Sequence, residues 1–178
     1  MVYRVPNDAY FTPSQLVRSY FATHAPFISK SETILEPCVG DGGIAIPLRE
    51  LGYQVEGTDI VDGDEFDATK SEYWGDKSPD WVITNPPFNQ ATPIIEHALG
   101  HAKHGVIMLL RSSYLEPCKD RRHLLDNRIR QITYCNPRPK FRTDTKGSDS
   151  STVVFIVWDR YAIDETRVNY LVDWNRKS

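Results

Sequence analysis

The segment of this sequence whose residue types most clearly suggest a chemical role is Asn85-Pro86-Pro87-Phe88. Two consecutive prolines fix the backbone torsions, so the side-chain oxygen of Asn85 and the carbonyl oxygen of Pro86 are held as rigid hydrogen-bond acceptors. Such a pair suits the two hydrogens of a planar amino group, and Phe88 offers a face on which the ring carrying that amine can stack. The segment predicts a site for an aromatic amine, with a rigid strand-ending turn as the alternative.

A glycine-rich loop, Glu36-Pro37-Cys38-Val39-Gly40-Asp41-Gly42-Gly43, lies upstream. Glycines let the backbone approach a ligand closely, and a helix that follows presents unpaired amides. The loop matches GxGxxG poorly and lacks a GK[ST] ending, which disfavours dinucleotides and ATP. Asp59 ends the next predicted strand, where a carboxylate can accept hydrogen bonds from both hydroxyls of a ribose. A plain turn and a solvated Asp59, with Asp62 and Asp64 close by, are the alternatives.

Hydrophobic spacing indicates the elements that must position these loops. Thr12 and Pro13 are typical of an N-cap and a first helical residue. Strands that alternate with helices predict a doubly wound, mostly parallel sheet with ligands at the carboxyl ends of its strands. We expect helices at 13–23, 44–51, 92–104 and 119–128, and strands at 33–36, 53–59, 81–84, 106–110, 129–135 and 151–158.

Length and composition favour one ordinary globular domain over residues 1–178, with a packing helix or tail at 159–178. Hydrophobic residues make up 40% and charged residues 25% of the chain, which excludes disordered, collagen and coiled-coil classes. The start lacks the order of a signal peptide, no apolar run reaches the roughly 18 residues of a membrane helix, and the three cysteines are widely spaced. We therefore expect a cytoplasmic protein with reduced thiols, and no metal site, because the histidines lack paired ligands.

The charge is divided along the chain. Residues 1–102 carry 6 Lys/Arg against 15 Asp/Glu, whereas residues 103–178 carry 15 against 9. A basic region of this kind can hold a phosphate backbone, although a solvated, salt-bridged surface is an equal alternative. The residues we expect to contact phosphates are Arg111, Arg138, Lys140, Arg142 and Lys146.

The sequence resembles the class I S-adenosylmethionine-dependent methyltransferases, specifically amino-methyltransferases with a (D/N/S)PP(Y/F/W) motif. The resemblance lies in three segments that occur in the family's order, ILEPCVGDGG, VEGTDI and ITNPPF. Tyr10-Phe11-Thr12-Pro13 is similar to the cofactor-binding element that DNA adenine methyltransferases of the gamma arrangement place before the glycine loop. The stretch from Pro137 to Trp158 is similar to the strand hairpin of phage and bacterial adenine N6-methyltransferases. The resemblance implies a single Rossmann-like domain with a mostly parallel seven-stranded sheet, an antiparallel C-terminal hairpin strand and helices on both faces.

The resemblance also implies S-adenosylmethionine as cofactor. Gly40 and Gly42 would line its methionine moiety, and Asp59 would hold the ribose. Asp67, with Asp64 as competitor, would lie near the adenine amino group. The full set of implied cofactor contacts is Phe11, Thr12, Pro13, Glu36, Pro37, Cys38, Gly40, Gly42, Asp59, Ile60, Asp67 and Asn85.

For the reaction, the resemblance implies that Asn85 and Pro86, within the catalytic segment Asn85 to Phe88, accept hydrogens of the target amine while Phe88 stacks on an extruded base. We expect methyl transfer to the N6 amine of adenine in DNA. Few residues follow Trp158, whereas related DNA enzymes usually carry a target-recognition domain there. Low sequence selectivity, or reading by the loop at 138–151, is therefore ranked above a partner that supplies specificity. The alternatives are an RNA base methyltransferase, a protein glutamine methyltransferase and a non-catalytic nucleic-acid-binding protein.

The basic residues lead to a first prediction. Replacing Lys140 and Lys146 by alanine should weaken nucleic-acid binding on all sequences alike, because bonds to phosphates carry no sequence information. For every phosphate that is no longer neutralised, the slope of log K against log salt should decrease in size by about 0.9 on duplex DNA. Binding titrations at several salt concentrations measure this slope, and an unchanged slope would contradict the assignment.

Overall fold

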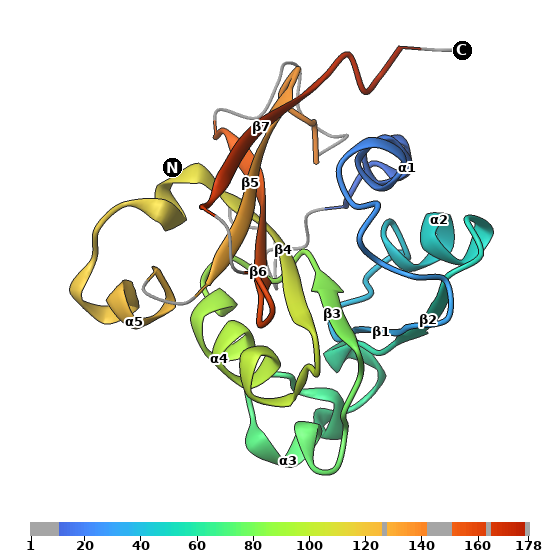
Figure 1. Cartoon of the computed structure of the whole chain (residues 1–178). Coiled ribbons are helices and arrows are strands. Elements are labelled where there is room, and N and C mark those ends of the chain that lie inside the picture. Colours follow the sequence, from blue (N-terminus) through green and yellow to red (C-terminus); the bar gives the residue numbers. More distant parts are fainter. Residues whose placement is uncertain (1–10, 126–127, 142–150, 163–164, 177–178) are drawn as a thin grey trace, which may run out of the picture.

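The computed structural model describes residues 11–125, 128–141, 151–162 and 165–176. Seven strands form one sheet in the order β2-β1-β3-β4-β6-β5-β7 (Figure 1). Neighbouring strands pair in parallel except at β6, which runs antiparallel to both β4 and β5. This confirms the predicted sheet with its reversed C-terminal hairpin strand. The strands are β1 (Thr33–Glu36), β2 (Gln54–Gly57), β3 (Trp81–Thr84), β4 (Gly105–Arg111), β5 (Ile129–Asn136), β6 (Val153–Asp159) and β7 (Arg167–Val172).

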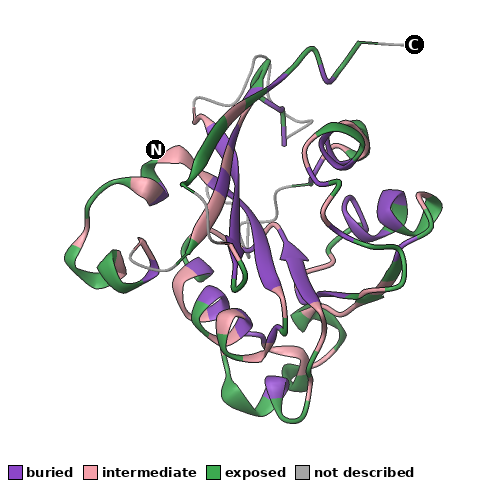
Figure 2. Cartoon of the chain, in the orientation of Figure 1, coloured by how far each residue is buried: buried purple, intermediate pink, exposed green. Residues whose placement is uncertain are grey.

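Helices cover both faces of the sheet, as predicted. On one face, α1 (Ser14–Thr23) and α2 (Ala45–Glu50) pack in a core that contains Tyr20 and Phe155, whose rings stack with centroids 3.9 Å apart. On the other, α3 (Ser71–Trp74) and α4 (Ala91–His101) share a core with Trp158, and α5 (Arg122–Leu125) contributes Leu124. Figure 2 shows the buried strands between these two layers. Among the described helices, none is both long and apolar enough to cross a membrane.

The central strands are continuous apolar runs because both of their faces are covered. All seven residues of β6 are buried, and so are the first six of β4. At Gly105, where β4 begins, an added Cβ would lie 2.2 Å from the carbonyl oxygen of Trp158 and 2.7 Å from the Trp81 ring. A glycine is therefore required at that position for β4 and β6 to approach each other.

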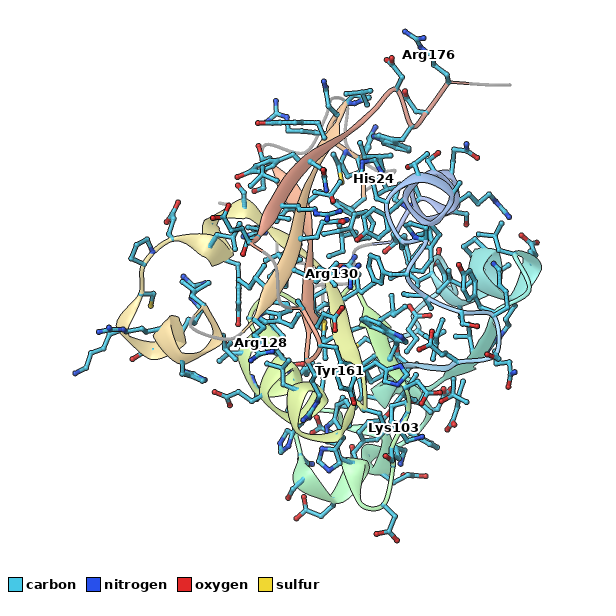
Figure 3. The ribbon with its side chains drawn as sticks, in the orientation of Figure 1. His24, Lys103, Arg128, Arg130, Tyr161 and Arg176 are labelled. Atoms are coloured by element: carbon cyan, nitrogen blue, oxygen red, sulfur yellow. The ribbon has the colours of Figure 1, made fainter. Side chains whose placement is uncertain are left out.

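Ion pairs hold the amino-terminal ends of the parallel strands. The Asp80 carboxylate accepts hydrogen bonds from the backbone and hydroxyl of Thr33, at 2.8 and 2.9 Å, and pairs with Lys103 at 3.2 Å. These contacts, led by the Thr33 backbone, lower the Asp80 pKa. At the same end of the sheet Arg130, which is labelled in Figure 3, pairs with the buried Asp159 at 2.6 Å. At the end of the sheet opposite the carboxyl ends of the parallel strands, charged side chains are therefore paired with one another.

Two sequence expectations about helices are wrong in detail. Helix α1 begins at Ser14 with Pro13 as its N-cap residue and no side-chain cap, so Thr12 is not the cap. The Thr12 hydroxyl contacts Asn85 instead. The helix expected at 119–128 consists, in its described part, of a 3-10 turn η5 (Lys119–Arg121) and the single turn of α5.

The expectation of a packing helix or tail at 159–178 is also corrected, because this region contains strand β7. It pairs in parallel with β5, and Tyr170 stacks on Tyr134 with ring centroids 5.6 Å apart. Val168, Tyr170 and Val172 are exposed, whereas Leu171 is buried. From Val168 to Val172, exposed residues therefore alternate with less exposed ones, which is strand rather than helix periodicity.

The close packing at Gly105 generates a prediction about stability. Gly105→Ala should lower the free energy of unfolding by about 1–3 kcal/mol, because the added methyl group overpacks the contact between β4 and β6. Gly100→Ala is the matched control: no atom lies within 4 Å of the new Cβ in α4, so it should stabilise by about 0.5–1 kcal/mol. Urea denaturation of both variants measures the difference, and equal stabilities would contradict the packing argument.

Candidate functional site

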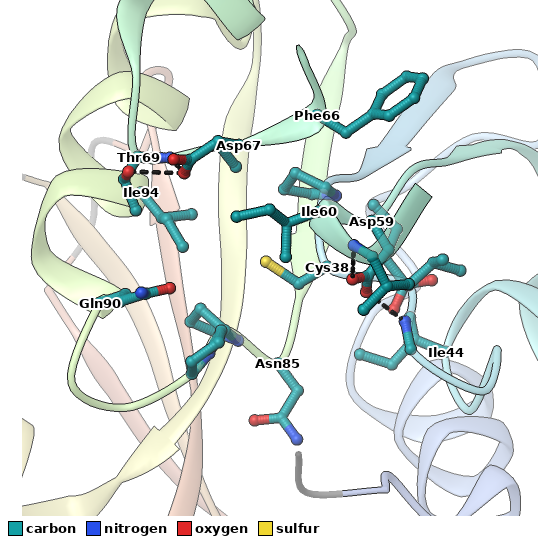
Figure 4. Close-up of a pocket in the computed structure, with 18 of the residues that line it drawn as sticks. Cys38, Ile44, Asp59, Ile60, Phe66, Asp67, Thr69, Asn85, Gln90 and Ile94 are labelled. Atoms are coloured by element: carbon teal, nitrogen blue, oxygen red, sulfur yellow. Dashed lines mark hydrogen bonds between the residues drawn. The ribbon is translucent and has the colours of Figure 1, made fainter. Parts of the chain in front are cut away.

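A cavity of about 860 Å³ opens at the carboxyl ends of β1, β2 and β3 (Figure 4). This volume falls within the range of small-ligand sites. The glycine loop, the segment after β2, the proline segment after β3 and the residues before α1 all reach it. The structure therefore brings together stretches that the sequence separates. Predicted residues on its wall are Phe11, Thr12, Glu36, Pro37, Cys38, Gly40, Asp59, Ile60, Asp67, Asn85, Pro86 and Pro87.

Three predicted residues do not line the cavity. Gly42 is buried with φ +83°, and a Cβ there would lie 2.6 Å from Ile46 Cδ1, so its role is to form the turn. Pro13 precedes the first turn of α1. Phe88 lies beside the Arg111 guanidinium, whose carbon is 4.5 Å from the ring centroid.

Several lining residues were not in the predicted set. Asp64, the sequence competitor of Asp67, lines the same cavity, so both carboxylates are present. Phe66 and Ile94 add apolar wall, and Gln90 adds an amide (Figure 4). Phe66 lies in the same short segment as Asp64 and Asp67, and this position could have identified it as a lining residue. For Ile94 the sequence predicts a helix but gives no indication that the side chain reaches the cavity.

The Asp59 carboxylate ties two loops of the site together. One oxygen accepts from the Gly40 backbone amide at 2.8 Å and the other accepts from the Val61 amide at 3.2 Å. Gly40 adopts φ +51°, a left-handed conformation that favours glycine. Since each carboxylate oxygen can accept more than one hydrogen bond, Asp59 retains capacity for a ligand.

The N-terminal segment passes very close to the glycine loop. An added Cβ on Gly43 would lie 2.3 Å from the carbonyl oxygen of Thr12. Only a residue without a side chain permits this approach. It places Phe11 and Thr12 on the cavity wall.

Glu36 is a buried carboxyl group at the base of the cavity, with a relative exposure of 1%. Burial raises its pKa well above the usual value, and a hydrogen bond from the Ala45 backbone amide opposes that rise. Its Oε2 atom has no hydrogen-bond partner among the described residues. The group is therefore placed to gain from a cationic or donor ligand.

Asp67 differs from Glu36 in that its pKa is lowered. The Thr69 hydroxyl is the largest cause, donating a hydrogen bond at 2.6 Å, and the Thr69 backbone amide donates another at 3.0 Å. Lys70 pairs with the other oxygen at 3.2 Å. Asp67 therefore remains an ionised acceptor at neutral pH.

The described wall of the cavity is strongly acidic. It carries five carboxyl groups, and no lysine, arginine or histidine is among its described residues. Burial raises the pKa of the Cys38 thiol to about 12, so this residue adds no negative charge near neutral pH. Such a wall favours a cation and disfavours a phosphate. The carboxyl groups are those of Glu36, Asp41, Asp59, Asp64 and Asp67.

The proline segment begins directly where β3 ends. Pro86 is buried and Pro87 is half-buried, which fixes the backbone on which Asn85 stands. The Asn85 side-chain nitrogen donates a hydrogen bond to the Thr12 hydroxyl at 3.1 Å.

The residues predicted to contact phosphates divide between different regions. Arg111 is the last residue of β4 and is half-buried beside Phe88. Arg138 and Lys140 are exposed after β5. Arg142 and Lys146 lie outside the described residues, so the structure assigns them no position.

No protein-family model matches the sequence, and no curated protein matches it. Solved structures are similar in fold. The M protein of the type I restriction enzyme EcoKI superposes with a TM-score of 0.65 at 14% identity, covering 92% of this chain and 48% of that protein. A modification subunit of a putative type I restriction enzyme from Vibrio vulnificus gives 0.57 at 16% identity, over 85% and 44%. This chain thus spans about half the length of these proteins.

A putative RNA methyltransferase from Pyrococcus horikoshii is similar over most of both chains, covering 89% of this chain and 92% of that one, with a TM-score of 0.56 and 16% identity. These likenesses confirm the predicted Rossmann-like fold.

The buried Glu36 generates a prediction about pH. Its folded-state pKa lies above its unfolded value, so the native state binds more protons and the free energy of unfolding falls as pH rises from about 4.5 toward the folded pKa. Glu36→Gln cannot ionise, so it should remove this decline and be more stable than the parent protein at pH 8. Urea denaturation between pH 4 and pH 8 measures the effect. The exposed Glu56→Gln is the control, and a Glu36→Gln profile parallel to the parent would contradict the prediction.

Proposed function

We propose that this protein transfers a methyl group from S-adenosylmethionine to the exocyclic N6 amine of adenine in DNA, with limited sequence specificity. One observation carries the proposal: Asn85 and Pro86 line the same cavity as the glycine loop and Asp59. A donor held by the glycine loop and an amine held by the proline segment would therefore meet in one enclosed space.

The charge and the volume of the cavity support this cofactor. S-adenosylmethionine carries a sulfonium and an ammonium group, and the four aspartates of the wall would favour both cations. The buried Oε2 of Glu36 offers an acceptor that no described residue uses. Ile60, Phe66 and Ile94 supply an apolar wall for an adenine ring, next to the ionised Asp67. When bound, the cofactor supplies an activated methyl group.

The chain's own residues would prepare the acceptor amine. The lone pair of an adenine amino group is delocalised into the ring, so the amine is a poor nucleophile. Asn85 and the carbonyl of Pro86 would accept its two hydrogens and favour the pyramidal form, whose lone pair points at the methyl group. Positioning and fixed dipoles then supply most of the catalysis, without a strong general base.

The face beyond the proline segment supports a nucleic-acid substrate. Phe88, which does not itself line the cavity, would stack on the extruded base, and the Arg111 guanidinium beside its ring would bring positive charge to that position. Arg138 and Lys140 add exposed cations suited to phosphates. The acidic cavity would bind the cationic cofactor, and these basic residues would bind the polyanionic substrate.

A nucleoside assay tests the proposal. The protein and its Asn85→Ala variant are incubated with S-adenosylmethionine and, separately, with duplex DNA, single-stranded DNA, structured RNA and a glutamine-containing protein. Nucleosides and peptides are then analysed by mass spectrometry. We expect N6-methyldeoxyadenosine with DNA and at least about a 100-fold loss in Asn85→Ala, because a fixed polar group at a reaction centre is worth roughly that factor. Asn169→Ala, on β7, is the matched control and should retain activity.

The other outcomes assign the alternatives. Methylation of RNA alone would keep the chemistry and replace the substrate, and methylated glutamine would make the protein a protein methyltransferase. Cofactor binding by calorimetry with no methylated product would favour a non-catalytic nucleic-acid-binding protein.

A further inference from the structure

Thr12 joins the segment before α1 to the residue after β3. Its side chain is nine-tenths buried, with a relative exposure of 7%, and its hydroxyl oxygen accepts a hydrogen bond from Asn85 Nδ2 at 3.1 Å. This contact was not expected from the sequence, which suggested that Thr12 caps a helix. It connects two motifs that lie 73 positions apart.

The backbone on which Thr12 stands is firmly held. On one side its carbonyl lies against Gly43, where any side chain would collide with it. On the other side α1 is anchored in the core by Leu16, Val17 and Tyr20, all fully buried. Because the backbone is fixed on both sides of Thr12, its side chain can serve as a rigid hydrogen-bond partner for another group.

Asn85 needs such a partner because the prolines that follow it fix only the backbone. They leave its side-chain torsions undetermined, and the terminal amide torsion of asparagine is intrinsically broad. The two ends of an amide also differ chemically, since the oxygen accepts and the nitrogen donates. A reversed amide would point donors at the hydrogens of a target amine.

We propose that Thr12 is a positioning residue, whose hydroxyl accepts a hydrogen bond from the Asn85 nitrogen and so fixes the side-chain torsions of the residue that would accept the target amine. The inference rests on the proposed function, because it gives a reason for the orientation of Asn85 in that reaction. It assigns the Thr12 hydroxyl to the catalytic asparagine and not to the cofactor.

Two substitutions at Thr12 separate this role from packing. Thr12→Val keeps the shape and removes the hydroxyl, whereas Thr12→Ser keeps the hydroxyl. Thr23→Val, at an exposed position on α1, is the matched control. The first readout needs no cofactor: NMR of the Asn85 side-chain NH₂, assigned by its absence in Asn85→Ala, should show slowed hydrogen exchange in the parent and in Thr12→Ser, and fast exchange in Thr12→Val.

The second readout is the kinetics of methylation. We expect Thr12→Val to lower kcat by about 10- to 100-fold, as for a misplaced catalytic group, with the Kd for S-adenosylmethionine unchanged. Thr12→Ser should restore most of the loss. In an Asn85→Ser background, which has no amide to orient, Thr12→Val should have little further effect.

The results distinguish this inference from the proposed function. Fast exchange of the Asn85 NH₂ in the parent protein would overturn the positioning role whether or not any methylation is found. Normal kcat in Thr12→Val, or a loss confined to cofactor affinity, would overturn it while leaving the methyltransferase proposal intact. An absence of methylation in the parent would instead refute the proposed function, with the NMR result still reporting on the bond.

Discussion

The shared direction of β1, β2 and β3 is the constraint on which the site depends. Neighbouring strands lie about 4.8 Å apart, so three adjacent parallel strands bring their last residues within about 10 Å of one another. Glu36 ends β1, Asp59 follows β2 and Asn85 follows β3. The backbone pairing therefore assembles three polar side chains that are distant in sequence, and the Asp59 contact with Gly40 fixes the remaining freedom between two of their loops.

The cavity keeps carboxyl groups in two different environments. Asp67 is stabilised as an ion by Thr69 and Lys70, while Glu36 is buried away from the water that would solvate its charge. A fold selected for stability alone would replace a carboxyl group whose Oε2 atom has no hydrogen-bond partner among the described residues. Its presence is understandable if a positively charged ligand compensates for the burial. The cost of burying Glu36 in the protein alone would then be offset when a cation binds beside it.

Much of the fold follows from local sequence. The apolar runs of β3, β4 and β6 and the spacing of Leu16, Val17 and Tyr20 predict their elements because burial alone determines them. Strand β7 escapes such reasoning because its apolar residues Val168 and Tyr170 are exposed, so a helix or tail could account for its composition equally well. Most of the predicted cavity residues lie on its wall, since they follow strands that are readily recognised. The contact of Thr12 with Asn85 and the place of Ile94 depend on tertiary packing, which no local pattern encodes.

The reversed strand β6 has a consequence for the other half of the molecule. Because β5 is antiparallel to β6, and β6 to β4, strand β5 points the same way as β4. Residues after β5 therefore leave the sheet on the side where Asn85 lies. There exposed and buried residues alternate: Arg138 and Lys140 are exposed, whereas Pro139 and Phe141 are buried. One change of strand direction thus places Arg138 and Lys140, from a distant part of the chain, at the same end of the sheet as Asn85.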